Sequence, residues 1–344
     1  MKQRFTLLIL LLITIVGFAN AQPSKKGTPV KVYSEITYAK PTSTPLTMDI
    51  YVPQTGKRSY PVLVIYHGGG WLINTNKIMS SMSDYVASNG EYVVCNVNYR
   101  LLGDSNNTTT INQIIEDVFG ALAWIKENIA QYGGDPTLVA VTGDSAGGHL
   151  TSSVVLMGDK LESHGFKGET LGFTPSYIPK GETAESLAQK GYLKVQAAII
   201  SYGAFDMYAA CQGGFETSSN VFWSFAKVQP RGLFGSGIDV NNNGSYYKAV
   251  SPIYNIPNAK QKQLPPQLFT VGSKDNLTTP SSIKSYIAKL KEAGHTDIEY
   301  WEYDGRPHAF LDSGSNQFLG TSFEKDAPAA LDKIIDFLNK KLKK

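Results

Sequence analysis

The stretch Leu138-Val-Ala-Val-Thr142 is followed at once by Gly143-Asp-Ser-Ala-Gly-Gly148, and this junction decides the fold. The first five residues are mostly apolar, as expected of a buried strand, and the residues from His149 to Met157 are helix-like. A Gly-x-Ser-x-Gly pattern at a strand-to-helix turn is a nucleophile elbow, in which glycines permit a tight turn that lifts the serine hydroxyl above the sheet. The alternative is a structural glycine-rich turn. We expect Ser145 to be the nucleophile of a hydrolase.

Short apolar segments alternate with helical patterns along the rest of the chain, which predicts an α/β fold. The expected strands are 46–52, 61–66, 92–97, 138–142, 195–201, 268–271 and 298–303. The expected helices are 111–129, with Thr110 as its N-cap, 281–293 and 329–342. Together with the elbow, these elements predict the α/β-hydrolase fold, a mostly parallel twisted central sheet with helices on both faces.

The N-terminal residues have the pattern of a secretory signal peptide. Lys2 and Arg4 precede an apolar run that ends in Ala19-Asn-Ala21, so we expect cleavage after Ala21. A membrane anchor is the alternative, but the run is shorter than the roughly 20 residues that span a bilayer. The expected organisation is a signal peptide at 1–21 and one hydrolase domain at 28–344, exported to the periplasm or the extracellular space without a membrane anchor after cleavage.

The composition is that of an ordinary globular protein, with 42% hydrophobic and 18% charged residues. The formal net charge of +3 falls to +1 when residues 1–21 are removed, because that segment carries two basic residues and no acidic ones. Nothing in this charge favours nucleic acid or an anionic membrane as a partner.

Backbone donors for a developing negative charge are expected after the strand 61–66. His67-Gly-Gly-Gly-Trp71 follows that strand, and its glycines leave N–H groups without side chains in front of them. With the N–H of Ala146, they can form an oxyanion hole. His67 could be a base, but its place beside the glycines favours a structural role in shaping the loop. Trp71 could either line an acyl pocket or belong to the core.

A serine is a weak nucleophile without a base, and hydrolases of this fold order their triad as serine, acid, histidine. His308 stands in a loop after the strand 298–303 and is the expected base. The other histidines after the elbow are less suited: His149 should point into helix packing, His164 lies in a polar insertion, and His295 is expected at the surface. Asp275, just beyond the strand 268–271, is the expected acid. Its rivals, Asp304 and Asp312, are too close to His308 in the chain to come from another strand.

Two stretches interrupt the alternation of strands and helices, at 158–191 and 204–257. The first joins the helix after the elbow to the strand 195–201, so it should emerge far from Ser145. The second begins where that strand reaches the catalytic end, so it should lie over or beside the site. Its aromatic side chains could line a substrate pocket or pack a small core of their own, and they are Phe205, Tyr208, Phe215, Phe222, Trp223, Phe225 and Phe234. We take Trp71, Phe205 and Trp223 as the candidate substrate contacts.

Taken together, the motifs resemble the bacterial esterases related to hormone-sensitive lipase and to feruloyl and acetyl-xylan esterases. The matching pieces are His67-Gly-Gly-Gly-Trp71, Asn98-Tyr-Arg-Leu101, Asp117, Gly143-Asp-Ser-Ala-Gly-Gly148, the Asp275 loop and Gly305-Arg-Pro-His308. The resemblance implies hydrolysis of carboxylic esters without a cofactor and assigns the oxyanion donors to Gly69 and Gly70. It also implies a structural ion pair between Arg100 and Asp117. The two insertions depart from the family pattern.

The expected function is therefore a secreted serine carboxylesterase that works through an acyl-enzyme, with acetyl or feruloyl side chains of plant polysaccharide or small esters as substrates. A peptidase or arylformamidase on the same fold, and a hydrolase-fold binding protein without catalysis, are the alternatives. No metal site is expected. Asp239-Val-Asn-Asn-Asn-Gly244 resembles the start of a calcium loop, but Val250 stands where the bidentate glutamate should be, and a plain turn is the simpler interpretation. Cys95 and Cys211 could form a disulfide, although a core thiol is the simpler interpretation for Cys95.

Overall fold

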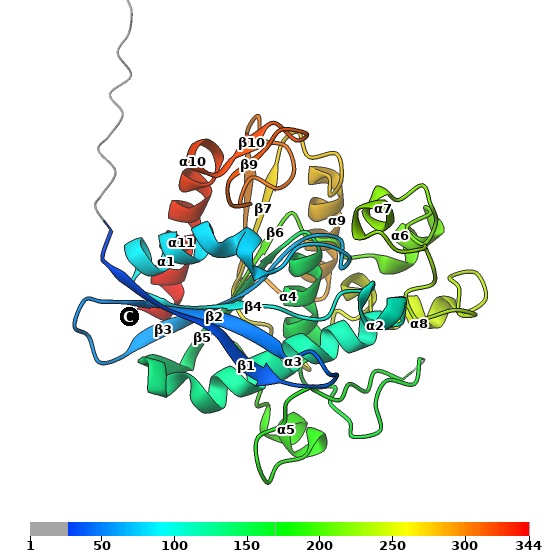
Figure 1. The fold of residues 1–344 in the computed structure, drawn as a ribbon, viewed down its shortest axis with the longest axis horizontal. Helices are drawn as coiled ribbons and strands as arrows, with labels where there is room; N and C mark the ends of the chain where they lie inside the picture. Colours follow the sequence, from blue (N-terminus) through cyan, green and yellow to red (C-terminus); the bar gives the residue numbers. More distant parts are fainter. Residues whose placement is uncertain (1–26, 169, 344) are drawn as a thin grey trace, which may run out of the picture.

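The computed structural model describes residues 27–168 and 170–343, so the expected signal peptide at 1–21 lies outside the described residues. Its main sheet has eight strands in the order β1-β2-β4-β3-β5-β6-β7-β8 (Figure 1). These strands are β1 (Val30–Ala39), β2 (Leu46–Pro53), β3 (Tyr60–Tyr66), β4 (Val93–Val97), β5 (Gly134–Asp144), β6 (Ala197–Ser201), β7 (Gln267–Gly272) and β8 (Ile298–Tyr303). A separate two-stranded sheet pairs β9 (Ser315–Asn316) with β10 (Thr321–Ser322).

The sheet is antiparallel at one edge and parallel through the rest. β1 pairs antiparallel with β2, and β2 with β4, whereas the strands from β4 across to β8 are parallel. All seven expected strands are present, and β1 is an addition. It was missed because it is an edge strand with mostly exposed or half-exposed side chains and a register shift near Glu35, so it lacks a steady apolar alternation.

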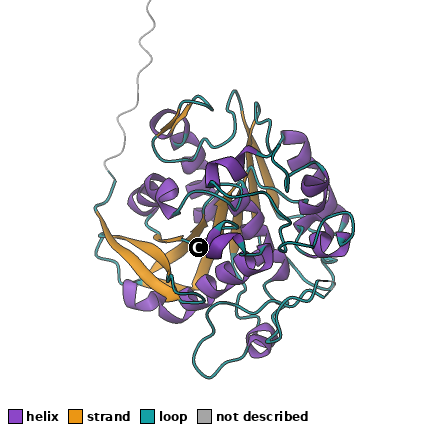
Figure 2. Ribbon diagram, turned by 45° about the vertical axis from the view of Figure 1, so that its right-hand side comes forward, coloured by secondary structure: helices purple, strands orange, loops and turns teal. Residues whose placement is uncertain are grey.

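Helices cover both faces of the sheet (Figure 2), which confirms the predicted fold class. α1 and α11 contact one another on one face, and α3 and α4 contact one another on the other. The helices are α1 (Ser80–Gly90), α2 (Asp104–Asn107), α3 (Ile111–Asn128), α4 (Ala146–Met157), α5 (Ala184–Lys190), α6 (Met207–Gln212), α7 (Val221–Ala226), α8 (Gly244–Ala249), α9 (Pro280–Glu292), α10 (Phe323–Asp326) and α11 (Pro328–Leu342). Three 3-10 turns accompany them, η1 (Asn76–Met79), η2 (Ile129–Tyr132) and η3 (Pro252–Tyr254).

The long helix α3 forms for the reasons its sequence suggests. Its apolar stripe at helical spacing is buried, including Ile111, Ile114 and Val118. Its first turn is closed by Gln113, whose Oε1 accepts a hydrogen bond from the N–H of Thr110 at 3.0 Å. The helix therefore packs one face on the sheet and on α4, behind the nucleophile.

The parallel strands bring the segments of interest to one edge of the sheet. His67 follows β3, Ser145 follows β5, Tyr202 follows β6, the Asp275 loop follows β7 and the His308 loop follows β8. Because the carboxyl ends of parallel strands meet at the same edge, this edge is where an α/β sheet builds a site.

Two further features of the described residues concern membrane-spanning helices and the cysteines. Within the two described ranges, no helix combines the length and the apolar character needed to cross a bilayer. Cys95 and Cys211 are both buried and unpaired, so the disulfide is not formed and Cys95 is a core thiol, as the simpler interpretation expected.

Candidate active site

Ser145 stands at the turn between β5 and α4 with φ 52° and ψ −114°, angles that residues with a side chain rarely adopt. A Cβ on Gly143 would lie 2.2 Å from the carbonyl oxygen of Gly147, and one on Gly147 would lie 1.9 Å from that of Tyr66. Both distances are far below van der Waals contact, so only glycine allows α4 to start this close to β3. Such a conformation costs on the order of 1–3 kcal/mol, which the surrounding structure must offset to hold Ser145 at the edge.

His308 and Asp275 form a hydrogen-bonded pair from two different loops. The distance from His308 Nδ1 to Asp275 Oδ2 is 2.7 Å, and both side chains are buried. Asp275 Oδ1 accepts hydrogen bonds from the N–H groups of Leu277 and Thr278 at 2.8 and 2.9 Å. These backbone donors fix the carboxylate, so that its other oxygen orients the imidazole.

Neither rival carboxylate pairs with His308. Asp304 is exposed and accepts a hydrogen bond from the Ser273 hydroxyl at 3.1 Å. Asp312 makes no side-chain contact with His308 Nδ1, which pairs with Asp275. The structure therefore brings Asp275, rather than its rivals, to the predicted base.

The end of β6 contacts both the elbow, through Ser201, and the base, through Tyr202. The N–H of Ser145 donates to the carbonyl of Ser201 at 3.0 Å, which ties the elbow to the end of β6. The next residue, Tyr202, is fully buried, and its ring meets the imidazole of His308 edge-on with centroids 4.7 Å apart. Both hydrogen bonds that His308 makes within the described part of the chain use Nδ1, which leaves Nε2 without a protein partner there. Contacts between a base and its nucleophile are often long in apo sites and tighten with substrate.

The glycine loop after β3 presents free backbone donors beside the elbow. Gly69 and Gly70 have φ of 121° and 60°, and the carbonyl of Gly69 accepts hydrogen bonds from Leu72 and Ile73 in a tight turn. Within the described ranges, the N–H groups of Gly69, Gly70 and Ala146 donate to no backbone acceptor outside the regular elements. Ala146 is the first residue of α4, where helical N–H groups have no partner within the helix. The three predicted oxyanion donors are therefore available.

His67 has the structural role expected of it. Its Nδ1 lies 2.7 Å from the carbonyl oxygen of Gly68, and its ring stacks on Tyr99 with centroids 4.3 Å apart. Burial lowers the pKa of His67 to about 4, so the ring is neutral near pH 7. It shapes the glycine loop from beneath.

Asp144 is a buried carboxylate that the sequence reasoning did not single out. A Cβ on Gly68 would lie 2.3 Å from its Oδ2, so the carboxylate packs against the glycine loop. Burial raises the pKa of Asp144 to about 6, and the charge of His308 acts in the opposite direction. Burial and then the charge of Asp144 also raise the pKa of Asp312. The position of Asp144 directly before Ser145 in the sequence was the signal that could have revealed this carboxylate.

Arg100 and Asp117 form the expected ion pair. Arg100 Nε and Nη2 donate to the two oxygens of Asp117, each at 2.7 Å, and the N–H of Arg100 adds a third hydrogen bond at 3.0 Å. The Asp117 side chain is wholly buried. The pair joins the loop after β4 to α3.

Among the remaining histidines, one prediction was wrong. His149 is buried in α4, with Nε2 2.8 Å from the carbonyl oxygen of Val250, and His164 is exposed. His295 was expected at the surface, but it is buried, with Nε2 2.8 Å from the carbonyl oxygen of Pro257. The glycine before it ends α9, and the chain then turns inward rather than outward.

The three aromatic residues predicted to contact substrate are all packed by protein atoms. Trp71 meets the rings of His149 and Phe215 edge-on, and Phe205 stacks on Tyr286 with centroids 3.8 Å apart. Trp223 is 1% exposed, and its Nε1 donates to the carbonyl of Phe215 at 2.7 Å. This packing favours the alternative in which they stabilise the insertion, and a substrate contact stays a prediction for them.

The second insertion begins at the nucleophile and lies over the glycine loop. The N–H of Ala204 approaches the carbonyl oxygen of Ser145 at 3.4 Å. Further along, a Cβ on Gly70 would lie 3.1 Å from Cγ of Phe222, so that ring packs against the backbone of a predicted oxyanion donor. Phe222 was one of seven aromatic candidates in the sequence, and nothing there distinguished it from its neighbours.

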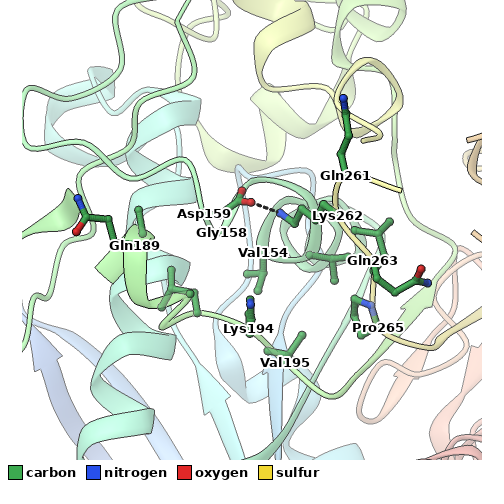
Figure 3. Close-up of a pocket in the computed structure, with 15 residues that line it drawn as sticks. Val154, Gly158, Asp159, Gln189, Lys194, Val195, Gln261, Lys262, Gln263 and Pro265 are labelled. Carbon is green, nitrogen blue, oxygen red and sulfur yellow. Dashed lines mark ion pairs between the residues drawn. The ribbon is translucent and has the colours of Figure 1, made fainter. Parts of the chain in front are cut away.

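One cavity lies away from the triad, and the first insertion borders it. It has a volume of about 540 Å³ and is lined by residues from the end of α4, from 188–195 and from 261–265 (Figure 3). Across it, Lys262 Nζ lies 2.8 Å from Asp159 and donates to the carbonyl of Leu156 at 2.9 Å, which stabilises the C-terminal end of α4. These segments lead into the amino ends of β6 and β7, opposite the edge that carries Ser145.

The expectation that the two insertions lie apart was wrong in one respect. The first insertion runs along α3, where the ring of Phe173 packs edge-on against Phe119. Phe166 then stacks on Phe234 of the second insertion with ring centroids 5.5 Å apart, and it also meets Tyr246. The order of elements along the chain predicts where each insertion leaves the sheet. It does not predict the path of each insertion beyond that point, which depends on aromatic packing.

The calcium-like segment is a turn that satisfies its own carboxylate. Asp239 Oδ1 accepts hydrogen bonds from the N–H groups of Asn241 and Asn242, and Oδ2 accepts one from the Asn242 amide. Over the described ranges, no group of three or more His, Cys, Asp or Glu side chains is placed to hold a metal ion.

Comparison with known proteins assigns the family. The model of the BD-FAE family matches residues 48–290 of the 344 in the chain. The chain belongs to the BD-FAE family. The match includes the glycine loop, the elbow and the Asp275 loop, and it confirms the resemblance to esterases related to hormone-sensitive lipase.

Curated relatives of this BD-FAE protein carry esterase names. It is 28% identical over 260 residues to the esterase LipQ of Mycobacterium tuberculosis, a match that covers 74% of this chain and 51% of LipQ. It is 32% identical over 142 residues to the carboxylesterase NlhH of the same species, covering 40% of this chain and 43% of NlhH. LipM of M. tuberculosis, a probable carboxylic ester hydrolase, is covered to 52%. The chain thus spans about half the length of the curated relatives it matches.

A solved structure gives the same fold. Esterase 2 of Thermogutta terrifontis, in a form phosphorylated by paraoxon, superposes with a TM-score of 0.62 at 20% identity. The alignment covers 90% of this chain and 94% of that one. At this identity the likeness is one of fold, and it supports the α/β-hydrolase assignment.

Proposed function

We propose that this protein is a serine carboxylesterase with Ser145, His308 and Asp275 as its triad. One observation carries the proposal: a His308–Asp275 pair at 2.7 Å lies at the same sheet edge as a serine held at φ 52° beside three available N–H donors. Membership of the BD-FAE family and the esterase names of its relatives support the same chemistry.

The mechanism follows from these positions. His308 Nε2 takes the proton of Ser145 as Oγ attacks the ester carbonyl, and Asp275 stabilises the resulting imidazolium through Nδ1. The N–H groups of Gly69, Gly70 and Ala146 bind the oxyanion, and each such donor is worth on the order of 10²–10³ in rate. His308 then protonates the leaving alcohol, and water repeats the attack to release the acid from the acyl-enzyme.

The test is turnover combined with covalent labelling. We expect the purified protein to hydrolyse p-nitrophenyl acetate and to be labelled once by a fluorophosphonate. Ser145→Ala should lose both while its unfolding transition stays close to that of the wild type, because the hydroxyl contributes little packing. Residual turnover above a few per cent in the variant would refute the assignment of the nucleophile.

The same labelling separates the alternatives. A binding protein without catalysis would give no label and no turnover. A peptidase or an arylformamidase would be labelled but would prefer peptide amides or N-formylkynurenine over esters. We expect ester turnover to exceed both.

We further propose that the protein is exported and acts on ester side chains of plant polysaccharide, acetyl or feruloyl. The N-terminal pattern ending at Ala21 supports export. The family resemblance supports the substrate class. N-terminal sequencing of protein from a fractionated host, and release of acid from acetylated xylan and methyl ferulate, test the two parts separately.

A further inference from the structure

The short helix α7 presents an apolar face to solvent beside the glycine loop. Trp223 points into the protein, whereas Val221 and Phe225 on the other side are 55% and 61% exposed. Phe222, next to them, is half-buried against Gly70. Exposed apolar side chains that adjoin one another on one element commonly mark a binding surface.

This face is held in place rather than free to collapse onto the core. The Asn220 side chain accepts a hydrogen bond from the N–H of Phe222 at 3.1 Å and donates one to the carbonyl of Phe215 at 2.9 Å. Trp223 Nε1 donates to the same carbonyl. Beyond the helix, the N–H of Val228 bonds to the carbonyl of Trp223 at 3.2 Å. With Trp223 buried as the anchor, the opposite face of the helix stays exposed.

A second anchor ties the segment after α7 to the loop after β4. Arg231 donates to the backbone carbonyls of Leu102, Asn107 and Thr109, and Leu102 in turn donates to the carbonyl of Trp71 at 2.8 Å. Hydrogen bonds thus connect the segment that follows α7 to the end of the glycine loop. The apolar face is therefore preformed, which lowers the cost of binding a ligand there.

The order of strands decides which part of an ester would lie against this face. β5, with Ser145 at its end, separates β3, with the glycine loop, from β6, β7 and β8, with the His308–Asp275 pair. The leaving alcohol must lie toward His308, which protonates it. The carbonyl oxygen lies at Gly69, Gly70 and Ala146. An acyl group on the β3 side of Ser145 would then lie where Phe222 packs on Gly70.

We propose that Val221, Phe222 and Phe225 form the acyl-binding subsite and select esters of bulky apolar or aromatic acids over acetates. The proposal rests on the esterase function proposed above and narrows its substrate class. Phe222 borders the carbonyl position, and Phe225 and Val221 extend the subsite outward along α7. The two phenylalanine rings lie edge to face with centroids 6.3 Å apart, an arrangement that offers a planar acyl group an aromatic wall.

The test compares acyl groups on one leaving group. kcat/KM is measured for the p-nitrophenyl esters of acetic, octanoic and cinnamic acids in the wild type, Phe222→Ala and Phe225→Ala. We expect the wild type to prefer the octanoate and the cinnamate. Each variant should lower the ratio of cinnamate to acetate kcat/KM, by about tenfold or more for Phe222→Ala, as is typical when an apolar contact is removed from a pocket.

Phe318→Ala is the matched control, since Phe318 is 94% exposed in the separate segment between β9 and β10. It should leave every ratio unchanged. Urea unfolding of each variant checks the fold. Phe225→Ala, which loses little packing, keeps the test valid if Phe222→Ala does not fold.

The outcomes are separable. Equal losses on acetate and cinnamate in both variants would overturn the subsite. The subsite would also be overturned if the loss of kcat/KM in the variants depended on the alcohol rather than on the acid, measured with methyl, ethyl and nitrophenyl cinnamates. A wild type that turns over no ester and takes no fluorophosphonate label would instead refute the proposed function itself.

Discussion

The buried histidine of α4 makes the stability of the fold depend on pH. His149 donates to the carbonyl of Val250 at 2.8 Å and meets the ring of Trp71 edge-on, and its Nδ1 has no hydrogen-bond partner within the described ranges. Burial lowers the pKa of His149 to about 4, against an ordinary value of 6.5. Below pH 6.5, His149 therefore becomes protonated in the unfolded chain but stays neutral in the folded chain. The free energy of unfolding consequently falls as the pH is lowered.

The size of the effect follows from the difference between these pKa values. At 1.36 kcal/mol for each pKa unit, lowering the pH from 7 to 4 costs about 3 kcal/mol of the free energy of unfolding at this one residue. His149→Gln removes the titrating group and keeps a donor that can reach Val250. We expect the variant to be less stable than the wild type at pH 7, because packing against Trp71 is lost, and the gap to close by most of 3 kcal/mol at pH 4.5.

The assay is urea unfolding of both proteins at pH 7, 6, 5 and 4.5, with the midpoint and slope reported at each pH. His164→Gln, at an exposed position, controls for the change of side chain. Parallel pH profiles for the wild type and His149→Gln would refute the reasoning, because they would show that this histidine titrates alike in the folded and unfolded chains.

Three further predictions follow from the site. Between pH 4 and pH 7, the stability of Asp144→Asn relative to the wild type should rise by about 2 kcal/mol, measured by urea unfolding. The folded wild type keeps its proton up to a pKa of about 6, whereas the unfolded chain loses it near the ordinary value of 3.8, so the wild type loses stability as the pH rises. Gly147→Ala should lower kcat/KM for a nitrophenyl ester at least 100-fold and also lower Tm, because its methyl group would lie 1.9 Å from the carbonyl oxygen of Tyr66; wild-type kinetics would contradict this. Asp117→Asn should cost about 3–5 kcal/mol in urea unfolding by leaving Arg100 without its carboxylate, and a loss below 1 kcal/mol would count against a structural ion pair.

The parts of the fold that depend on local pattern could be predicted from the sequence. Inner parallel strands such as β3 and β6 are mostly apolar runs because they are buried on both faces, so their positions could be predicted without knowing their partners. The edge strand β1 (Val30–Ala39) is half solvated and irregular, and its pairing with β2 is decided by tertiary contacts. The residues of β1 have too little apolar alternation to predict a strand from the sequence.

The candidate site also contains residues that could be predicted from the sequence and residues that could not. Ser145, Asp275 and His308 each follow a strand, so chain order alone brought them to one edge. Tyr202 also follows a strand, and Asp144 is the last residue of β5, but neither residue type indicates a role. Tyr202 lies beneath His308 only because the chain turns sharply at φ 38° after β6. Such a turn has no signature in a tyrosine.

The second insertion was the least predictable part. Its aromatic residues looked equivalent in the sequence, yet Trp223 is buried and Phe225 is exposed two positions later on the same short helix. Which face of α7 turns inward depends on the acceptor that Phe215 offers to Trp223. The buried face of α7 is therefore determined by contacts between residues that are distant in the sequence. Such contacts cannot be predicted from a single sequence.

The position of the second insertion has a consequence for how such a protein can change over time. Residues 204–257 leave the sheet at the end of β6 and rejoin it before β7, while the triad and the donors of the glycine loop lie outside this stretch. Substitutions in the insertion can reshape what reaches the serine without touching the groups that react with it. Grafting this one segment between relatives is therefore a direct route to new selectivity on an unchanged chemical centre.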